Sequence, residues 1–305
     1  MSGASETGGA GSDPRASVLK RVFVVGSGIM GSGIAAQCAV AGYPVTLEDI
    51  NEELARRGLT NAVRALDHAV ERKKIGPGDR DAAVGRIDSA IGLRRAASAQ
   101  VVIEAAPEDL ALKRRIFRDL EEAAHPSALL ASNTSSLPIT SIGQDLKDPG
   151  RLVGLHFFNP VLQMPLIELI PGHTTRAEVL EAARSFAASL GKTVVTSRDT
   201  PGFVTTRALA VLVNEAAWML YEGVATKEDI DSAYRLGFRH PMGPFELVDL
   251  VGLDTAVAIL DVLWDGFRDS RYRACPLLRT MVAAKKLGRK TGEGFYRYPM
   301  SPEQP

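Results

Sequence analysis

The 305-residue sequence is poor in cysteine, with only Cys38 and Cys275. The two lie far apart and lack partners at metal-ligand spacing, so we expect neither a disulfide scaffold nor a metal site. Long apolar runs are also missing. None approaches the roughly 18 residues that a transmembrane helix needs, so we expect no membrane partner.

An excess of either charge is absent too, because 36 Lys and Arg residues balance 36 Asp and Glu residues. A neutral chain does not predict a nucleic-acid partner, since such binding depends on basic contacts to phosphates. The length and composition fit a globular protein of two domains. Residues 1–18 are rich in Gly, Ser and Ala without the apolar segment of a signal peptide. They predict a disordered leader and a cytoplasmic protein.

Short apolar runs alternate with helical patterns over residues 19–199, as at 22–25 and 101–104. Repeated β-α units of this kind predict a mostly parallel, doubly wound sheet. After Pro201-Gly202 the strand signals almost vanish, and helices are expected over 204–222, 227–236 and 250–267. The sequence therefore predicts an α/β protein with a Rossmann-type domain at 19–199 and an all-α domain at 200–305.

A glycine fingerprint, Gly26-Ser27-Gly28-Ile29-Met30-Gly31, lies between the first strand and the first helix. In G-x-G-x-x-G the glycines permit a tight turn, backbone approach to a pyrophosphate and close helix packing. The helix N-terminus offers N–H groups to the phosphates. We expect Gly26, Gly28, Ile29, Met30 and Gly31 to bind a dinucleotide.

Asp49 ends the second strand, 23 residues after Gly26. A carboxylate at that place binds a ribose 2′-hydroxyl and repels a 2′-phosphate, so NAD is favoured over NADP. Arg56 and Arg57 follow closely and keep NADP open as the second choice.

His156 stands apart from the other four histidines because it ends the apolar strand expected at 152–158. Glu168 lies inside the apolar segment 166–170, where a carboxylate is costly to bury without a partner. If the two strands are neighbours, Glu168 can accept a hydrogen bond from one imidazole nitrogen and make the other a better base. A hydrogen-bonded core histidine without a catalytic role is the alternative.

Six segments together resemble the 3-hydroxyacyl-CoA dehydrogenase family, especially its short bacterial 3-hydroxybutyryl-CoA dehydrogenases. They lie between Arg21 and Tyr298 and read GSGIMGSGIA, VIEAAPEDLALK, ASNTSSLPIT, HFFNPVLQMPLIELI, DTPGF and LGRKTGEGFYRY. The resemblance implies reversible hydride transfer between an (S)-3-hydroxyacyl-CoA and NAD, in a homodimer formed through the second domain.

The resemblance also implies a role for each matching residue. His156 is the base, Glu168 orients it, and Ser135 contacts the substrate, although a helix N-cap also fits Ser135. The implied cofactor contacts are Glu108, Lys113, Ser135, Asn159 and Lys290.

One position departs from the family pattern, because Thr206 stands where an asparagine supports the active site. The change leaves substrate identity open: 3-hydroxyadipyl-CoA, a carrier-bound 3-hydroxyacyl group and a sugar acid are alternatives. A non-catalytic NAD-binding protein is a further one. Asn214 is a conceivable substitute for the missing asparagine. For the CoA phosphates, the basic run Arg72-Lys73-Lys74 is the expected contact, with a solvated helix end as the alternative.

Overall fold

The computed structural model describes residues 21–299, so the leader expected at 1–18 lies outside the described residues. The described chain is divided into two units. The first unit holds residues 21–134 and 139–199, and the second holds Ser135–Pro138 and residues 200–299. Each unit is built around its own hydrophobic core.

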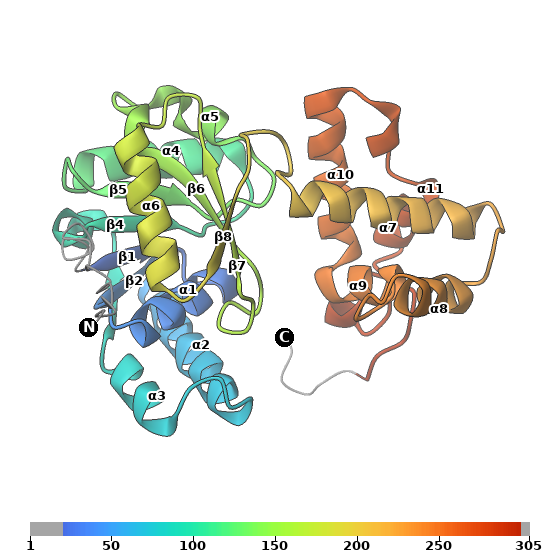
Figure 1. Ribbon diagram of the computed structural model, residues 1–305, viewed down its shortest axis with the longest axis horizontal. Coiled ribbons are helices and arrows are strands. Elements are labelled where there is room, and N and C mark those ends of the chain that lie inside the picture. Colours follow the sequence, from blue (N-terminus) through green and yellow to red (C-terminus); the bar gives the residue numbers. More distant parts are fainter. Residues whose placement is uncertain (1–20, 300–305) are drawn as a thin grey trace, which may run out of the picture. The chain divides into compact units, whose positions relative to one another are not determined.

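The first unit contains one eight-stranded sheet in the order β3-β2-β1-β4-β5-β6-β7-β8 (Figure 1). All neighbouring strands are parallel except β6 and β7, which pair antiparallel. The fold class expected from the sequence is confirmed. The strands are β1 (Val22–Val25), β2 (Val45–Asp49), β3 (Ile87–Ile91), β4 (Val101–Glu104), β5 (Leu129–Ser132), β6 (Leu152–Phe157), β7 (Leu166–Pro171) and β8 (Thr193–Thr196).

Helices cover both faces of this sheet (Figure 1). Side chains of α1, α2 and α6 share one hydrophobic core with the strands, while α4 packs against α5. The central strands are short, apolar and fully buried, as expected for strands covered on both faces. The helices of this unit are α1 (Ile29–Val40), α2 (Glu52–Glu71), α3 (Pro77–Val84), α4 (Leu110–Ala123), α5 (Ile139–Ile142) and α6 (Ala177–Ser189).

Two elements of the first unit were not predicted, the helix α3 and the edge strand β3. The strand reads IDSAI and is only partly buried, because it pairs on one side alone. A half-exposed edge strand needs no continuous apolar run, and so it gives a weak pattern.

The second unit is helical, with Phe245, Leu260 and Tyr272 buried in its core. The helix expected over 250–267 corresponds to α10 but begins later, because Gly252 has φ +105° and separates it from the preceding helix. That conformation is accessible to glycine and interrupts a right-handed helix. The helices are α7 (Thr205–Tyr221), α8 (Lys227–Gly237), α9 (Pro244–Val251), α10 (Leu253–Phe267) and α11 (Pro276–Ala283).

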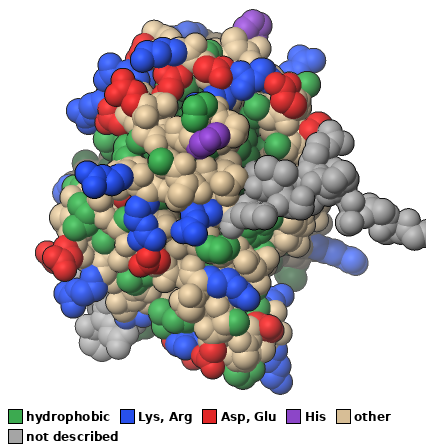
Figure 2. Space-filling view, turned by 90° about the vertical axis from the view of Figure 1, so that its left-hand side faces the viewer, with side chains coloured by type: hydrophobic (Ala, Val, Ile, Leu, Met, Phe, Trp, Pro, Cys, Tyr) green, Lys and Arg blue, Asp and Glu red, His purple; other side chains and the backbone are tan. Residues whose placement is uncertain are grey.

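Within residues 21–299, no helix is long and apolar enough to cross a membrane. On the face drawn in Figure 2, Lys and Arg side chains are interspersed with Asp and Glu side chains. Positive and negative side chains are therefore mixed on that face, in agreement with the balanced composition.

Candidate active site

The glycine fingerprint forms a tight turn between β1 and α1. Gly26 has φ +88°, and its N–H donates to Glu48 O at 3.0 Å. A Cβ on Gly31 would lie 1.7 Å from Gly26 O, so this close packing of turn and helix requires glycine. A Cβ on Gly28 would meet nothing within 4 Å, and no side chain caps the helix there. The turn thus leaves open space beside the positive end of α1, which suits a pyrophosphate.

Asp49 at the end of β2 is fixed by the same turn. Its Oδ2 accepts from Ser27 N at 2.8 Å and from Ser27 Oγ at 2.6 Å, and its Oδ1 accepts from Ile50 N at 2.8 Å. A carboxylate has about four acceptor positions, so one remains for a ribose hydroxyl. Together with the turn, this acceptor fits the adenosine half of NAD.

Glu108 and Lys113 meet in a network at the carboxyl ends of β4 and β5, in which Lys113 is buried and Glu108 is exposed. Lys113 Nζ lies 2.6 Å from Glu104 Oε1 and 3.4 Å from Glu108 Oε2. Glu104 and Lys113 are fully buried, which excludes a solvated charge for Lys113. Sequence reasoning missed Glu104, although it ends an apolar strand and gives the same signal that singled out Glu168.

The polar turn after β5 is tied to this network and to β6. Ser132 Oγ donates to Glu104 Oε2 at 2.6 Å, and Phe157 N donates to Asn133 Oδ1 at 2.9 Å. Ser135 lies in the turn and is partly buried. The helix α5 begins four residues later, and Asp199 accepts from its first two N–H groups at 2.6 and 2.7 Å. Asp199 therefore caps this short helix. The sequence analysis did not consider Asp199 for that position and had named a helix N-cap only as the alternative role of Ser135.

His156 and Glu168 lie directly opposite each other on β6 and β7. His156 Nδ1 is 2.7 Å from Glu168 Oε2, and both side chains are buried. The Phe158 ring packs on the imidazole with centroids 4.4 Å apart. A carboxylate at Nδ1 holds that nitrogen protonated and leaves Nε2 as the basic one.

A cleft of about 400 Å³ lies in the first unit between α1, α2 and the loop joining β6 to β7. Ile29 and Asn159, both predicted cofactor residues, line it. Its basic side chains come from α2 and from the residue that follows its last turn. They are Arg64, His68 and Arg72.

Lys73 and Lys74 follow the end of α2, are exposed, and are not among the residues that line this cleft. Of the basic run, only Arg72 lines it. Residues of α2 four apart share a helix face, which sets Arg64, His68 and Arg72 apart from their sequence neighbours.

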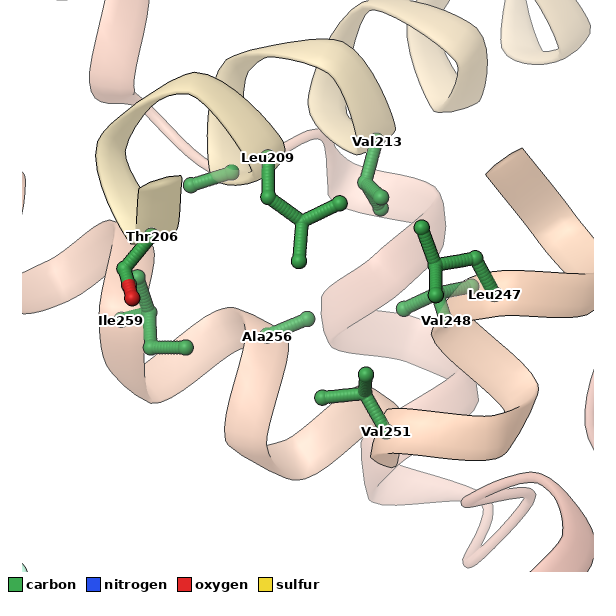
Figure 3. A pocket seen from close by; sticks show the side chains of 9 residues that line it. Thr206, Leu209, Val213, Leu247, Val248, Val251, Ala256 and Ile259 are labelled. Carbon is green, nitrogen blue, oxygen red and sulfur yellow. The ribbon is translucent and has the colours of Figure 1, made fainter. Parts of the chain in front are cut away.

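Thr206 lies near the start of α7 and is buried. Figure 3 shows it at one end of a small apolar pocket of about 20 Å³, whose other lining side chains come from α7, α9 and α10. Asn214 is no substitute for the family asparagine, because its amide donates to Arg273 O and accepts from Cys275 N. Lys290 forms an ion pair with Asp254 at the start of α10.

The sheet, the glycine turn and the acidic end of β2 define a nucleotide-dependent dehydrogenase with a helical second domain. Family models identify it further: the 3-hydroxyacyl-CoA dehydrogenase NAD-binding domain matches residues 21–200, and the C-terminal domain matches residues 202–298. The chain belongs to the 3-hydroxyacyl-CoA dehydrogenase family and is an NAD-dependent enzyme of that class.

Named relatives agree over nearly the whole chain. It is 44% identical to 3-hydroxybutyryl-CoA dehydrogenase of Bradyrhizobium diazoefficiens, over 93% of this chain and 97% of that one. For 3-hydroxybutyryl-CoA dehydrogenase of Mycobacterium tuberculosis the identity is 43%, over 92% and 99%. The crystal structure of (S)-3-hydroxybutyryl-CoA dehydrogenase from Ralstonia eutropha matches with a TM-score of 0.88 and 39% identity, over 92% and 100%.

Proposed function

We propose that this dehydrogenase interconverts (S)-3-hydroxybutyryl-CoA and acetoacetyl-CoA, with His156 as the general base and Glu168 as its orienting acid. The observation that carries the proposal is the 2.7 Å hydrogen bond between His156 Nδ1 and Glu168 Oε2 on paired strands. The four-carbon substrate is the one named for relatives at 43–44% identity.

The pair supports a simple division of labour. His156 Nε2 takes the proton of the 3-hydroxyl group, and the buried Glu168 carboxylate stabilises the imidazolium that forms. Bound NAD supplies the hydride acceptor. In the reverse direction, the imidazolium returns the proton to the oxygen of the 3-keto group.

The cleft beside α2 supports a place for the CoA part of the substrate. Arg64 and Arg72 offer two cations to phosphate groups, and a volume of about 400 Å³ is in the range of small-molecule sites. We assign the phosphate contacts to these two arginines instead of Lys73 and Lys74.

The second unit carries the proposed dimer interface. Val204, Leu250 and Val251 expose at least 39% of their surface, although they are apolar. Burying such side chains against a second copy is favourable, and the family expectation of a homodimer fits. Sedimentation equilibrium checks this assignment, and a monomer at micromolar concentration contradicts it.

The oxidation of NADH by acetoacetyl-CoA, followed by absorbance at about 340 nm, tests the substrate and the cofactor together. We expect turnover with NADH that exceeds turnover with NADPH, and loss of most turnover in His156→Gln with NAD affinity retained. A positioned base contributes about 10²–10⁴-fold. Turnover with 3-ketoadipyl-CoA or a carrier-bound acyl group, and none with acetoacetyl-CoA, would replace the proposed substrate.

A further inference from the structure

The loop between β6 and β7 connects the two strands that carry His156 and Glu168. It begins after Phe157 and ends before Leu166. Asn159, Pro160, Val161, Leu162 and Gln163 all line the cleft beside α2. The conformation of this loop therefore shapes one wall of the proposed CoA site.

Lys192, which follows β7 and α6 in the sequence, donates hydrogen bonds to this loop. Its Nζ donates to Val161 O at 2.6 Å and to Met164 O at 2.9 Å. Gln163 N and Met164 N both donate to Pro160 O at 2.9 and 3.0 Å, so the loop is a turn. The ammonium group donates hydrogen bonds to two backbone carbonyl oxygens of this turn.

The position of Lys192 is set by rigid neighbours. It directly precedes β8, which pairs with β7 in the register Leu166 to Thr193. Thr193 N also donates to Pro165 O at 2.7 Å, which fixes the far end of the loop. The pairing of β8 with β7 thus fixes the backbone of Lys192, and the ammonium group of Lys192 stabilises the turn.

The other side of the turn is packed against α1. A Cβ on Gly33 would lie 2.9 Å from Val161 Cγ2, and Val161 is buried. Gly33 and Val161 both line the cleft. The loop is therefore held between α1 and Lys192, and release of the ammonium group would leave two carbonyl groups to be hydrated.

The charge of Lys192 is not held there for the stability of the fold. Burial lowers the pKa of its amine to about 8. A lysine in such surroundings is less favourably charged than one in water. The two hydrogen bonds act mainly on the loop.

We propose that Lys192 is a positioning residue, whose ammonium group fixes the loop between β6 and β7 and so forms the wall of the CoA-binding cleft. The inference rests on the proposed location of CoA in this cleft. It assigns Lys192 a role in substrate binding without direct participation in proton or hydride transfer.

Coenzyme A itself is the probe. Because it lacks the acyl group, its affinity reports on the cleft without a contribution from the reacting atoms. Titration calorimetry on the full chain compares wild type, Lys192→Met and Lys147→Met, whose side chain is 82% exposed in the parent protein. We expect a roughly tenfold weaker CoA affinity in Lys192→Met, from loss of charge-assisted hydrogen bonds. NAD affinity is expected to stay within about twofold in both variants, and Lys192→Arg restores part of the CoA affinity.

Hydrogen exchange gives the second readout. The amides of Gln163 and Met164 should exchange faster in Lys192→Met than in wild type or Lys147→Met. Equal CoA affinity in wild type and Lys192→Met overturns the proposal, and so does a parallel loss of CoA and NAD affinity. If wild type turns over acetoacetyl-CoA but Lys192→Met binds CoA normally, only this inference fails. If wild type does not bind CoA, both this inference and the assignment of the cleft as the CoA site are wrong.

Discussion

Replacing Glu168 by glutamine removes the negative charge beside His156 and keeps a group of nearly the same size. The amide oxygen can still accept the hydrogen bond from Nδ1, which is 2.7 Å long in the wild type. The imidazole orientation is therefore retained, and the variant isolates the electrostatic part of the role proposed for Glu168.

The magnitude follows from burial and distance. Unit charges about 4 Å apart interact by about 4 kcal/mol at an effective dielectric constant near 20. If about half of the imidazolium charge has developed in the transition state, the loss is about 2 kcal/mol. That corresponds to a roughly thirtyfold lower kcat.

The assay is NAD reduction with saturating (S)-3-hydroxybutyryl-CoA, because the imidazolium charge develops in this direction. A matched control is Glu178→Gln on α6, because that carboxylate is exposed. We expect kcat of the control within about twofold of wild type and NAD affinity unchanged in both variants. Glu168→Ala should lose more than Glu168→Gln, since it removes the orienting group as well.

The result that refutes this reasoning is a folded Glu168→Gln variant with wild-type kcat. Thermal unfolding must accompany the assay, because Glu168 is fully buried. An equal loss in Glu168→Gln and Glu178→Gln would equally contradict a specific electrostatic role.

Further predictions concern the cofactor turn, the CoA cleft and the pH dependence of stability. Gly31→Ala should abolish NAD binding in an equilibrium titration, because its Cβ would lie 1.7 Å from Gly26 O; normal affinity would contradict the tight turn. Arg64→Ala and Arg72→Ala should each weaken CoA binding about tenfold and reduce its salt dependence, with NAD affinity unchanged. Because the pKa of Lys192 is about 8 when folded and near 10.5 otherwise, the unfolded chain binds more protons between these values. The contribution of Lys192 to stability therefore rises from about pH 8 to 10.5, and in urea unfolding the free energy of unfolding of wild type should rise relative to that of Lys192→Met over this range.

Much of the first unit was predictable because its patterns are local. The apolar runs at 22–25 and 101–104 were read directly from the sequence and match β1 and β4. The edge strand β3 and the break at Gly252 were missed, since partial burial and a single backbone angle leave little trace in composition.

The site divides in the same way. The glycine turn and the acidic end of β2 follow from spacing, because the turn and the strand end lie within one β-α-β unit. Glu104 was overlooked beside Glu108 and Lys113, although burial of Lys113 requires such a partner. The cytoplasmic location, the dimer and the roles of Ser135, Thr206 and Lys290 stay predictions.

The sequence by itself determined the class of fold, the dinucleotide fingerprint and the two unusual buried polar residues, His156 and Glu168. Periodicity and composition indicate which residues are buried. A buried polar group needs a hydrogen-bond partner, so its burial predicts that a partner exists. Only the tertiary structure decided which partner it is. The antiparallel pairing of β6 with β7 brings Glu168 to His156, and the helical phase of α2 turns Arg72 toward the cleft instead of Lys73. The sheet edge likewise brings Lys192 to a loop about thirty residues earlier in the chain. Those choices depend on which strands pair and where a helix ends, and no local pattern contains them.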